Sequence, residues 1–273
     1  MTISIIISVY KDVEALSLVI NSLLHQTHLA DEIIISEDGN SAEMKKYVNT
    51  LNEPSIKHLS QIDNGWQKNQ ALNQSIHASS SKYLIFIDGD CVPYPNFIEG
   101  HYALAKDNAV LCGRRSEPGE HFSTLLKTSQ LSIQKFVSNY VKNYFKLKQD
   151  NIRHYDEGLY LNPNASLLKI IKFFRRKKEN HIVGCNFSCW KSDLEKINGF
   201  DEDFHLPTTG EDTDIERRMR HFDIKMESCR YSANLIHLYH EKIFNPEISA
   251  KTEALMASKK DIFICKNGLR KLN

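Results

Sequence analysis

The chain has 273 residues, of which 41% are hydrophobic and 25% charged, a balance typical of a globular protein with one large or two small domains. Its formal net charge of +1 gives no sign of nucleic-acid binding. Six scattered cysteines follow no zinc-binding spacing, which indicates reduced thiols in a cytosolic protein.

Short apolar runs and helical apolar patterns alternate through the first hundred residues. The apolar N-terminus has neither the basic leader of a signal peptide nor the length of a membrane-spanning helix, so we expect a cytoplasmic protein that begins with a strand. The expected strands cover 3–9, 32–35, 56–59 and 83–87, and the expected helices cover 13–24, 41–51 and 69–78. This alternation predicts right-handed crossovers and an α/β fold with a mainly parallel central sheet and helices on both faces.

Polar side chains stand where three of these strands end. Ser8 and Tyr10 close the first strand, Asp38 follows the second, and Asp88-Gly89-Asp90 follows the fourth. The carboxyl ends of parallel strands share one edge of a sheet, where ligands of open α/β proteins bind. We therefore expect these groups to line one crevice.

The Asp88-Gly89-Asp90 segment carries the most informative chemistry. Two carboxylates one residue apart repel each other unless a cation or water separates them, and hard oxygen ligands suit Mg²⁺ or Mn²⁺. An ordinary polar turn after a strand is the alternative, because Asp-Gly is common turn chemistry. The sequence has no Gly-x-Gly-x-x-Gly or P-loop motif, which argues against dinucleotide dehydrogenases and P-loop enzymes. The pattern favours a nucleotide whose diphosphate is held by a metal ion.

In this order, the motifs resemble the nucleotide-sugar-binding half of a family 2 glycosyltransferase with the GT-A fold. The resemblance rests on the strand ending near Tyr10, the acidic pair ending in Asp38, the basic and Asn-containing segment 65–73, and the Asp-x-Asp motif 88–90. It implies that Asp38 binds the uracil ring, that the Tyr10 region contacts the base, and that Lys68 lies near the nucleotide or its phosphates. The donor-binding set implied is Ser8, Tyr10, Asp38, Lys68, Asn73, Asp88, Gly89 and Asp90. Asp90 is the implied ligand of Mn²⁺ or Mg²⁺, and Asp88 contacts the ribose or the ion.

The middle of the chain, 116–182, reads as a helical insertion. Apolar residues recur at helical spacing through 122–148, and 166–178 is a compact apolar segment with a basic end. Such a segment can lie on an anionic membrane surface with its lysines and arginines at the headgroups. The alternative is an ordinary domain helix whose charges face water.

An acidic cluster opens a predicted helix near Glu211 or Asp212. The helix macrodipole stabilises negative charge at this end. Thr209 and Asp212 also resemble a capping box, so a purely capping role for Asp212 is the alternative.

The resemblance extends to this second half. Gly-Phe-Asp-Glu at 199–202 followed by Gly-Glu-Asp-x-Asp at 210–214 is similar to the acceptor-side motif of the branch that includes galactosyltransferases. The resemblance implies that Asp212 is the general base that accepts the proton of the attacking acceptor hydroxyl. Asn186 and Glu211 are the implied contacts to the acceptor or donor sugar.

Two histidines follow within 234–241. In a regular strand His237 and His240 point to opposite faces, so at most one should face the site. The resemblance implies a third metal ligand here, and we favour His237 with His240 second. Two partly exposed histidines at a strand end are the alternative.

The resulting expectation is one GT-A domain. It comprises a nucleotide-sugar-binding half (1–115), the helical insertion (116–182), an acceptor and catalytic half (183–245) and a C-terminal tail (246–273). The implied enzyme is an inverting, metal-dependent glycosyltransferase that moves a hexose or N-acetylhexosamine from a UDP-sugar to a hydroxyl of a glycan or lipid-linked glycan, in bacterial surface polysaccharide synthesis such as that of lipopolysaccharide or capsule.

Two rival functions remain open at this point. A sugar-nucleotide nucleotidyltransferase should carry a glycine-rich, basic loop after its first strand, and 8–12 contains no glycine. A non-catalytic carbohydrate-binding protein on the same fold should lack the base or the metal-binding carboxylates, and both are present.

Overall fold

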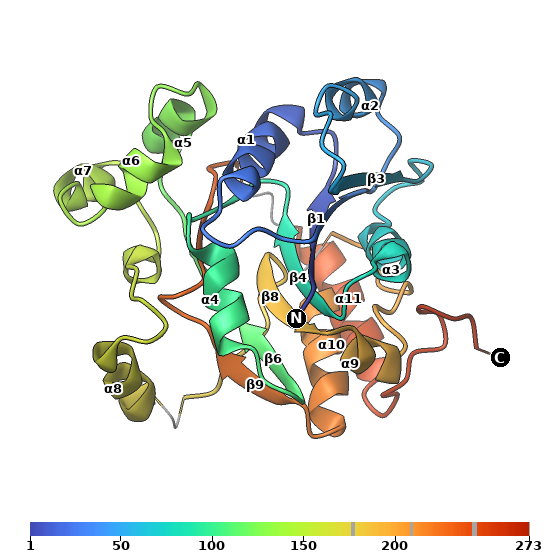
Figure 1. Ribbon diagram of the computed structural model, residues 1–273. Helices are drawn as coiled ribbons and strands as arrows, with labels where there is room; N and C mark the ends of the chain where they lie inside the picture. Colours follow the sequence, from blue (N-terminus) through green and yellow to red (C-terminus); the bar gives the residue numbers. More distant parts are fainter. Residues whose placement is uncertain (176–177, 208–209, 242–244, 273) are drawn as a thin grey trace.

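The computed structural model describes residues 1–175, 178–207, 210–241 and 245–272. A seven-stranded sheet forms its centre, in the order β3-β2-β1-β4-β8-β6-β9 (Figure 1). The strands are β1 (Ile3–Val9), β2 (Glu32–Glu37), β3 (Ile56–Ser60), β4 (Tyr83–Asp88), β6 (Ala109–Cys112), β8 (Asn186–Trp190) and β9 (Lys225–Ser228). All neighbouring pairs are parallel except the two made by β8, which runs antiparallel to both β4 and β6. The predicted, mainly parallel sheet is confirmed.

Helices cover both faces because residues along the central strands alternate between two cores. Ile3, Ile5 and Ile7 of β1 enter one apolar cluster, whereas Ile6 enters the other. The first cluster is covered by α1 (Val13–Leu24), α2 (Ala42–Val48), α4 (Phe97–Leu104) and α5 (Glu120–Lys127). The second is covered by α3 (Lys68–Ala78), α9 (Lys191–Lys196) and α10 (Gly210–His221).

A small second sheet joins distant parts of the chain, in the order β5-β10-β7. Its strands are β5 (Cys91–Pro93), β7 (Arg114–Ser116) and β10 (Asn234–His237). Cys91 pairs with His237 across the antiparallel β5–β10 ladder. This register places the end of β10 directly beside the Asp88-Gly89-Asp90 segment.

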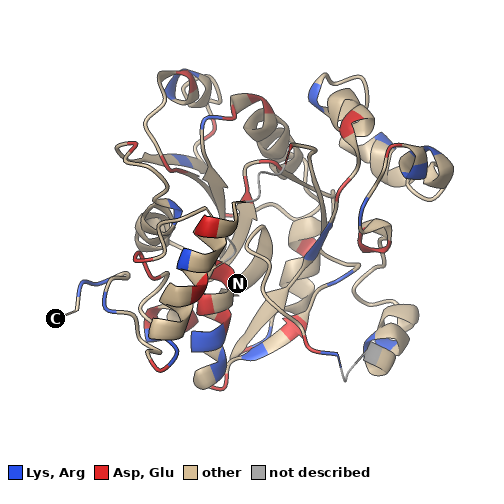
Figure 2. Cartoon of the chain, turned by 180° about the vertical axis from the view of Figure 1, so that it is seen from behind, with Lys and Arg blue, Asp and Glu red and all other residues tan. Residues whose placement is uncertain are grey.

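The predicted helical insertion consists of short helices rather than one long one. They are α5, α6 (Ile133–Ser138), α7 (Tyr144–Gln149), the 3-10 helix η1 (Tyr155–Gly158) and α8 (Ser166–Arg175). Three aromatic side chains of these helices and turns are buried in the first apolar cluster and pack the insertion against the sheet: Phe122, Phe136 and Tyr140. Figure 2, seen from behind, shows the basic segments of α7 and α8 at the right of the molecule.

The C-terminal segment packs back onto the domain. Asn245 caps α11 (Pro246–Ser258), and the Lys259 ammonium bridges Asp201 and Asp203 at 2.5 Å from each. All six cysteines are free, as predicted, and the structure buries all six. Among the described residues, no helix has the length and apolar character needed to cross a bilayer.

Candidate active site

A cavity of about 680 Å³ opens at the carboxyl ends of β1, β2 and β4, the edge predicted from the sequence. The lining comprises Ser8, Val9, Tyr10, Asp12, Asp38, Gly65, Trp66, Lys68, Asp88, Gly89, Asp90, Lys127, His237, Leu238, Tyr239 and His240. Seven of the eight predicted donor-binding residues are in this set; Asn73 is not. A second, much smaller cavity of about 10 Å³ shares Ser8, Lys68 and Asp88 with it and is also lined by Glu211 and Asp212.

Asp38 is the buried carboxylate at the far end of the cleft. Its Oδ1 accepts a hydrogen bond from the Gln61 amide at 2.8 Å, and its Oδ2 accepts one from the Gln67 backbone N–H at 2.7 Å. Its own N–H donates to the Val9 carbonyl at 3.0 Å. The neighbouring Glu37 turns away and accepts from the Ser41 N–H at 2.8 Å. Asp38 is therefore the member of the acidic pair that lines the cleft.

Tyr10 forms the exposed rim of the cleft. Its hydroxyl donates to Asp63 at 3.1 Å and accepts from the Lys11 ammonium at 2.7 Å. Hydrogen bonding to Asp63 raises the pKa of Lys11 above its usual range. Lys11 has a positive φ of 56°, which turns the chain sharply after β1. These contacts join the loop after β1 to the loop after β3.

Gly89 is required by the close approach of β4 to β1. A Cβ at this position would lie 2.8 Å from the Val9 Cγ2 and 3.2 Å from the Ser8 carbonyl oxygen. The Gly89 N–H donates to that same carbonyl at 2.7 Å. This contact fixes the spacing between Asp88 and Asp90.

Lys68 connects the two acidic motifs that are far apart in the sequence. Its ammonium lies 3.0 Å from Asp88 Oδ1 and 3.5 Å from Glu211 Oε1. Burial lowers the pKa of Lys68, but the charges of Asp88, Glu211 and Asp212 outweigh burial and hold it above its usual range. Lys68 is therefore a permanent cation between Asp88 and the carboxylates of the 210–214 motif.

Glu211 and Asp212 occupy the first turn of α10. Burial raises the pKa of Glu211 to about 8, although Lys68 opposes the shift. Burial also raises the pKa of Asp212, against the opposing effects of Lys68 and of the Gly184 N–H, which donates to Asp212 Oδ2 at 2.8 Å. Asp212 thus contacts a separate segment of the chain. Thr209, its predicted capping partner, lies outside the described residues.

Asp90 and both histidines converge at the other side of the cleft. The His237 and His240 Nε2 atoms each lie 3.6 Å from Asp90 Oδ2, and their ring centroids are 5.0 Å apart. The prediction that at most one histidine faces the site is wrong, because β10 ends at His237 and the chain leaves strand geometry before His240. Burial lowers the pKa of His237, which favours the neutral imidazole that ligates metals.

Two predicted site residues serve the fold instead. The Asn73 amide donates to the Phe200 carbonyl at 2.8 Å and to Glu202 at 2.9 Å, and its oxygen accepts from the Phe200 N–H at 2.9 Å. The Asn186 amide is fully buried; it donates to the Arg114 and Ala233 carbonyls, and its oxygen faces His101. With their hydrogen bonds used in this way, neither amide is available to a sugar in the cleft.

Seven lining residues escaped the sequence-based prediction, among them Lys127, Tyr239 and Trp66. Lys127 comes from α5 of the insertion, and Tyr239 lies between the two histidines, where its N–H donates to Ser123 at 2.9 Å. Trp66 lies within the segment 65–73 that carries Lys68, and a tryptophan between a predicted strand and a predicted helix was the available signal. No pattern in the sequence indicates that Lys127 lies in the same cleft as the Asp88-Gly89-Asp90 motif, which is almost forty residues earlier in the chain.

The parallel sheet with an acidic, lysine-bridged cleft at its carboxyl edge defines a nucleotide-sugar transferase type of α/β domain. Residues 4–197 match the profile of Glycosyl transferase family 2, and residues 166–241 match that of the N-terminal domain of galactosyltransferase. The chain belongs to glycosyl transferase family 2, and the protein is a glycosyltransferase enzyme.

Three curated relatives have similar sequences. The hyaluronan synthase of Pasteurella multocida is 26% identical over 41% of this chain and 12% of its own length. The uncharacterized glycosyltransferase YibD of Escherichia coli is 33% identical over 45% of this chain and 38% of its own length. The chondroitin synthase of Escherichia coli is 23% identical over 80% of this chain and 32% of its own length. The matches therefore span less than half the length of each relative.

Two solved structures resemble the fold. The mannosyltransferase PcManGT of Pyrobaculum calidifontis, in complex with GDP-Man and Mn²⁺, superposes with a TM-score of 0.55 at 10% identity over 88% of this chain and 57% of its own. TarS of S. aureus superposes with a TM-score of 0.57 at 14% identity over 95% of this chain and 39% of its own. These likenesses confirm the predicted GT-A fold.

Proposed function

We propose that this enzyme transfers a hexose or N-acetylhexosamine from a UDP-sugar to a hydroxyl of a glycan or lipid-linked glycan, with inversion at the anomeric carbon. The observation that carries the proposal is the Lys68 bridge from Asp88 at 3.0 Å to Glu211 at 3.5 Å. One ammonium group therefore contacts both the Asp88-Gly89-Asp90 motif and the acidic motif at 210–214, which we propose serve the donor and the acceptor. The relatives named chondroitin synthase and hyaluronan synthase support a role in polysaccharide synthesis.

Asp38 is the residue that we propose binds the nucleotide base of the donor. Both its oxygens are already oriented by Gln61 and Gln67, so the carboxylate presents a fixed acceptor to the cleft. A uracil N3–H is a donor that such an acceptor can bind. The Tyr10 ring at the rim supplies an apolar surface beside the base position.

The residues at the other wall fit a divalent cation. Asp90, Cys91 and His237 present ligand atoms that all lie within 4.8 Å of one another, and His240 faces the same Asp90 oxygen. Burial raises the pKa of Cys91 far above neutrality, so the carboxylate and the imidazoles are the expected ligands of Mn²⁺ or Mg²⁺. A bound cation would neutralise charge on the departing diphosphate.

Asp212 is the proposed general base. Its Oδ2 is held by the Gly184 N–H, and burial raises the pKa of its carboxyl toward the range in which a base works efficiently. The acceptor hydroxyl would transfer its proton to Asp212 as its oxygen bonds to the anomeric carbon and the nucleotide diphosphate leaves. One base is enough for a single displacement with inversion.

The proposal is tested by measuring UDP release from a panel of UDP-sugars with Mn²⁺, with and without oligosaccharide acceptors. We expect acceptor-stimulated release with one sugar class. Asp212→Asn should lower transfer by about 10²–10⁴-fold and keep UDP binding, whereas Asp90→Ala should lose metal-dependent UDP binding.

Asp223→Asn is the matched control, because it makes the same chemical change at an exposed position outside the cleft. Full activity in Asp212→Asn would remove the base assignment. Pyrophosphate release would instead identify a nucleotidyltransferase, and metal-independent binding without turnover would identify a carbohydrate-binding protein.

A further inference from the structure

Helix α8 turns an apolar face to solvent. Leu167, Ile170 and Phe174 follow helical spacing and are 53%, 52% and 78% exposed. On the opposite side Leu168 is buried against the domain. The helix therefore has two apolar stripes: one packs against the domain, and the other faces solvent.

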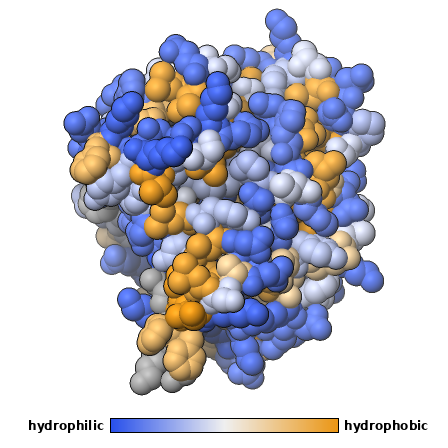
Figure 3. Space-filling model, turned by 60° about the vertical axis from the view of Figure 1, so that its left-hand side comes forward, coloured by the Kyte–Doolittle hydropathy of each residue, from blue (hydrophilic) through white to orange (hydrophobic). Residues whose placement is uncertain are grey.

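Helix α7 and the turn before it add to the same side of the molecule. Phe145 is 76% exposed and Val141 is 67% exposed. Both α7 and α8 lie on the side formed by the helical insertion (Figure 1). Figure 3 shows hydrophobic side chains gathered along this side and interrupted by hydrophilic ones. We call the surface of Val141, Phe145, Leu167, Ile170 and Phe174 the insertion face.

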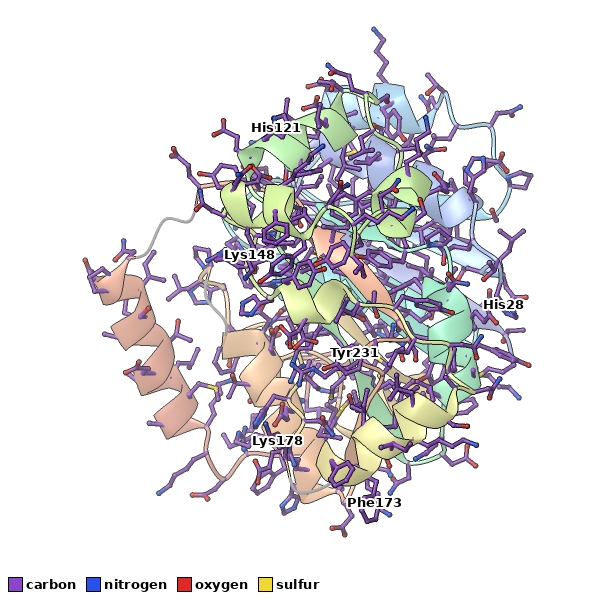
Figure 4. All side chains as sticks on the ribbon, turned by 90° about the vertical axis from the view of Figure 1, so that its left-hand side faces the viewer. His28, His121, Lys148, Phe173, Lys178 and Tyr231 are labelled. Carbon is purple, nitrogen blue, oxygen red and sulfur yellow. The ribbon has the colours of Figure 1, made fainter. Side chains whose placement is uncertain are left out.

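Lysines surround the insertion face. Residues 116–182 contain twelve Lys and Arg against six Asp and Glu, a formal charge of +6, so the rest of the chain carries −5. The exposed lysines on the described helices of the insertion and at their ends are Lys135, Lys142, Lys146, Lys148, Lys169 and Lys178. Figure 4 looks onto this side, with Lys148 above and Phe173 and Lys178 toward its lower edge. Arg176 and Lys177, part of the predicted basic end, lie outside the described residues.

We propose that the insertion face binds the surface of an anionic phospholipid bilayer, with α8 lying in the plane of the interface. Exposed Leu, Ile and Phe side chains can insert among the acyl chains while the surrounding lysines contact anionic headgroups. At ten residues, α8 is too short to cross the membrane. A second copy of this chain is a poor partner for this face, because a symmetric contact would bring together two insertion segments that each carry a formal charge of +6.

The same segment also reaches the active site. Lys127 of α5 lines the cleft, and Ser123 of α5 accepts the Tyr239 N–H beside the two histidines. The insertion therefore contacts the cleft at one end and carries the apolar side chains at the other. The bilayer proposal stands without the proposed function, because it concerns binding alone.

The test is flotation of the purified full chain with vesicles of phosphatidylcholine and phosphatidylglycerol in equal parts, at low salt. We expect binding to these vesicles, weak binding to pure phosphatidylcholine, and release at about 0.5 M salt, where the Debye length is a few ångströms. Ile170→Ser with Phe174→Ser should weaken binding at least tenfold. Leu29→Ser with Ile62→Ser is the matched control, since both positions are more than 60% exposed and lie outside the insertion.

A second variant, in which lysines of the insertion lose their charge, tests the proposal even if the serine variant does not fold. Lys142→Gln, Lys146→Gln and Lys169→Gln together should abolish the preference for anionic vesicles, and thermal unfolding checks that the variant is folded. Equal flotation of wild type and both variants would overturn the proposal. So would the absence of any flotation, or a wild-type dimer that the Ile170 and Phe174 changes convert to a monomer.

Discussion

Replacing Lys68 with Met removes the cation that stands between the two acidic motifs. At an effective dielectric constant of about 20, each of its contacts, at 3.0 Å to Asp88 and 3.5 Å to Glu211, corresponds to about 5 kcal/mol of direct attraction when the carboxyl is ionised, which for Glu211 requires a pH above about 8. The cost of burying the ammonium offsets much of this, so we expect a net loss of about 3–5 kcal/mol, the usual cost of breaking a buried charge pair.

The loss should depend on pH in a defined direction. The folded-state pKa of Glu211 is about 8, against an ordinary value of 4.5, so its contribution to stability is complete below about 4.5 and is lost as pH rises toward 8. Lys68 opposes this shift, so removing it raises the pKa of Glu211 further and extends the loss to higher pH. The destabilisation by Lys68→Met should therefore be smaller near pH 5, where Glu211 is neutral and only the Asp88 contact at 3.0 Å contributes, and largest near pH 9.

Urea unfolding at pH 5, 7 and 9 measures the effect. Lys106→Met is the matched control, because Lys106 makes a surface pair with Glu227 at 3.0 Å and both side chains are more than a third exposed. That pair should contribute less than about 1 kcal/mol at every pH. A Lys68→Met protein whose loss is below about 1 kcal/mol, or does not grow with pH, would refute the bridging role.

Three further changes separate structural from chemical roles. Glu211→Gln should leave stability unchanged near pH 5 and raise it by about 2–4 kcal/mol near pH 9, because a neutral side chain avoids the buried charge; urea midpoints would show this. Asn73→Ala should cost about 2–3 kcal/mol, because it leaves the Phe200 backbone groups without their partners, yet the donor KM should not change. Gly184→Ala should lower transfer more than tenfold while donor binding persists, because the added Cβ would lie 2.6 Å from Asp212 Oδ1; an unaltered rate would mean that Asp212 can move freely.

The gathering of Tyr10, Asp38 and Asp88 in one cleft could be predicted because its signals are local. Each strand end follows directly from an apolar run, and parallel crossovers then bring Tyr10, Asp38 and Asp88 to one edge. In the β1–β4 ladder Ser8 pairs with Asp88, so the carboxyl ends of the two strands lie side by side as inferred. Each of the three side chains lines the cleft.

The residues that the prediction misplaced are those whose role depends on non-local contacts. Asn73 and Asn186 stand near informative motifs, yet each meets a backbone segment from elsewhere in the chain that uses its amide. The exposed side of α8 was equally ambiguous, because an apolar segment gives no indication of which stripe is buried. His240 was undervalued because the end of β10 is decided by its pairing with β5, not by its own residues.

The meeting of the two acidic motifs follows from the reversed strand β8. Because β8 is antiparallel to both β4 and β6, β6 and β9 run in the same direction as β4. The helix α3 leads into β4 and α10 leads into β9, and both cover the same apolar cluster. Each helix must therefore begin at the carboxyl edge of the sheet, which puts Lys68 and Glu211 within 3.5 Å of each other. Both positive helix ends then face the cleft, where they favour carboxylates and an anionic diphosphate. A β8 parallel to β4 would send α10 the other way and separate Asp212, the proposed base, from the proposed donor site by the thickness of the domain.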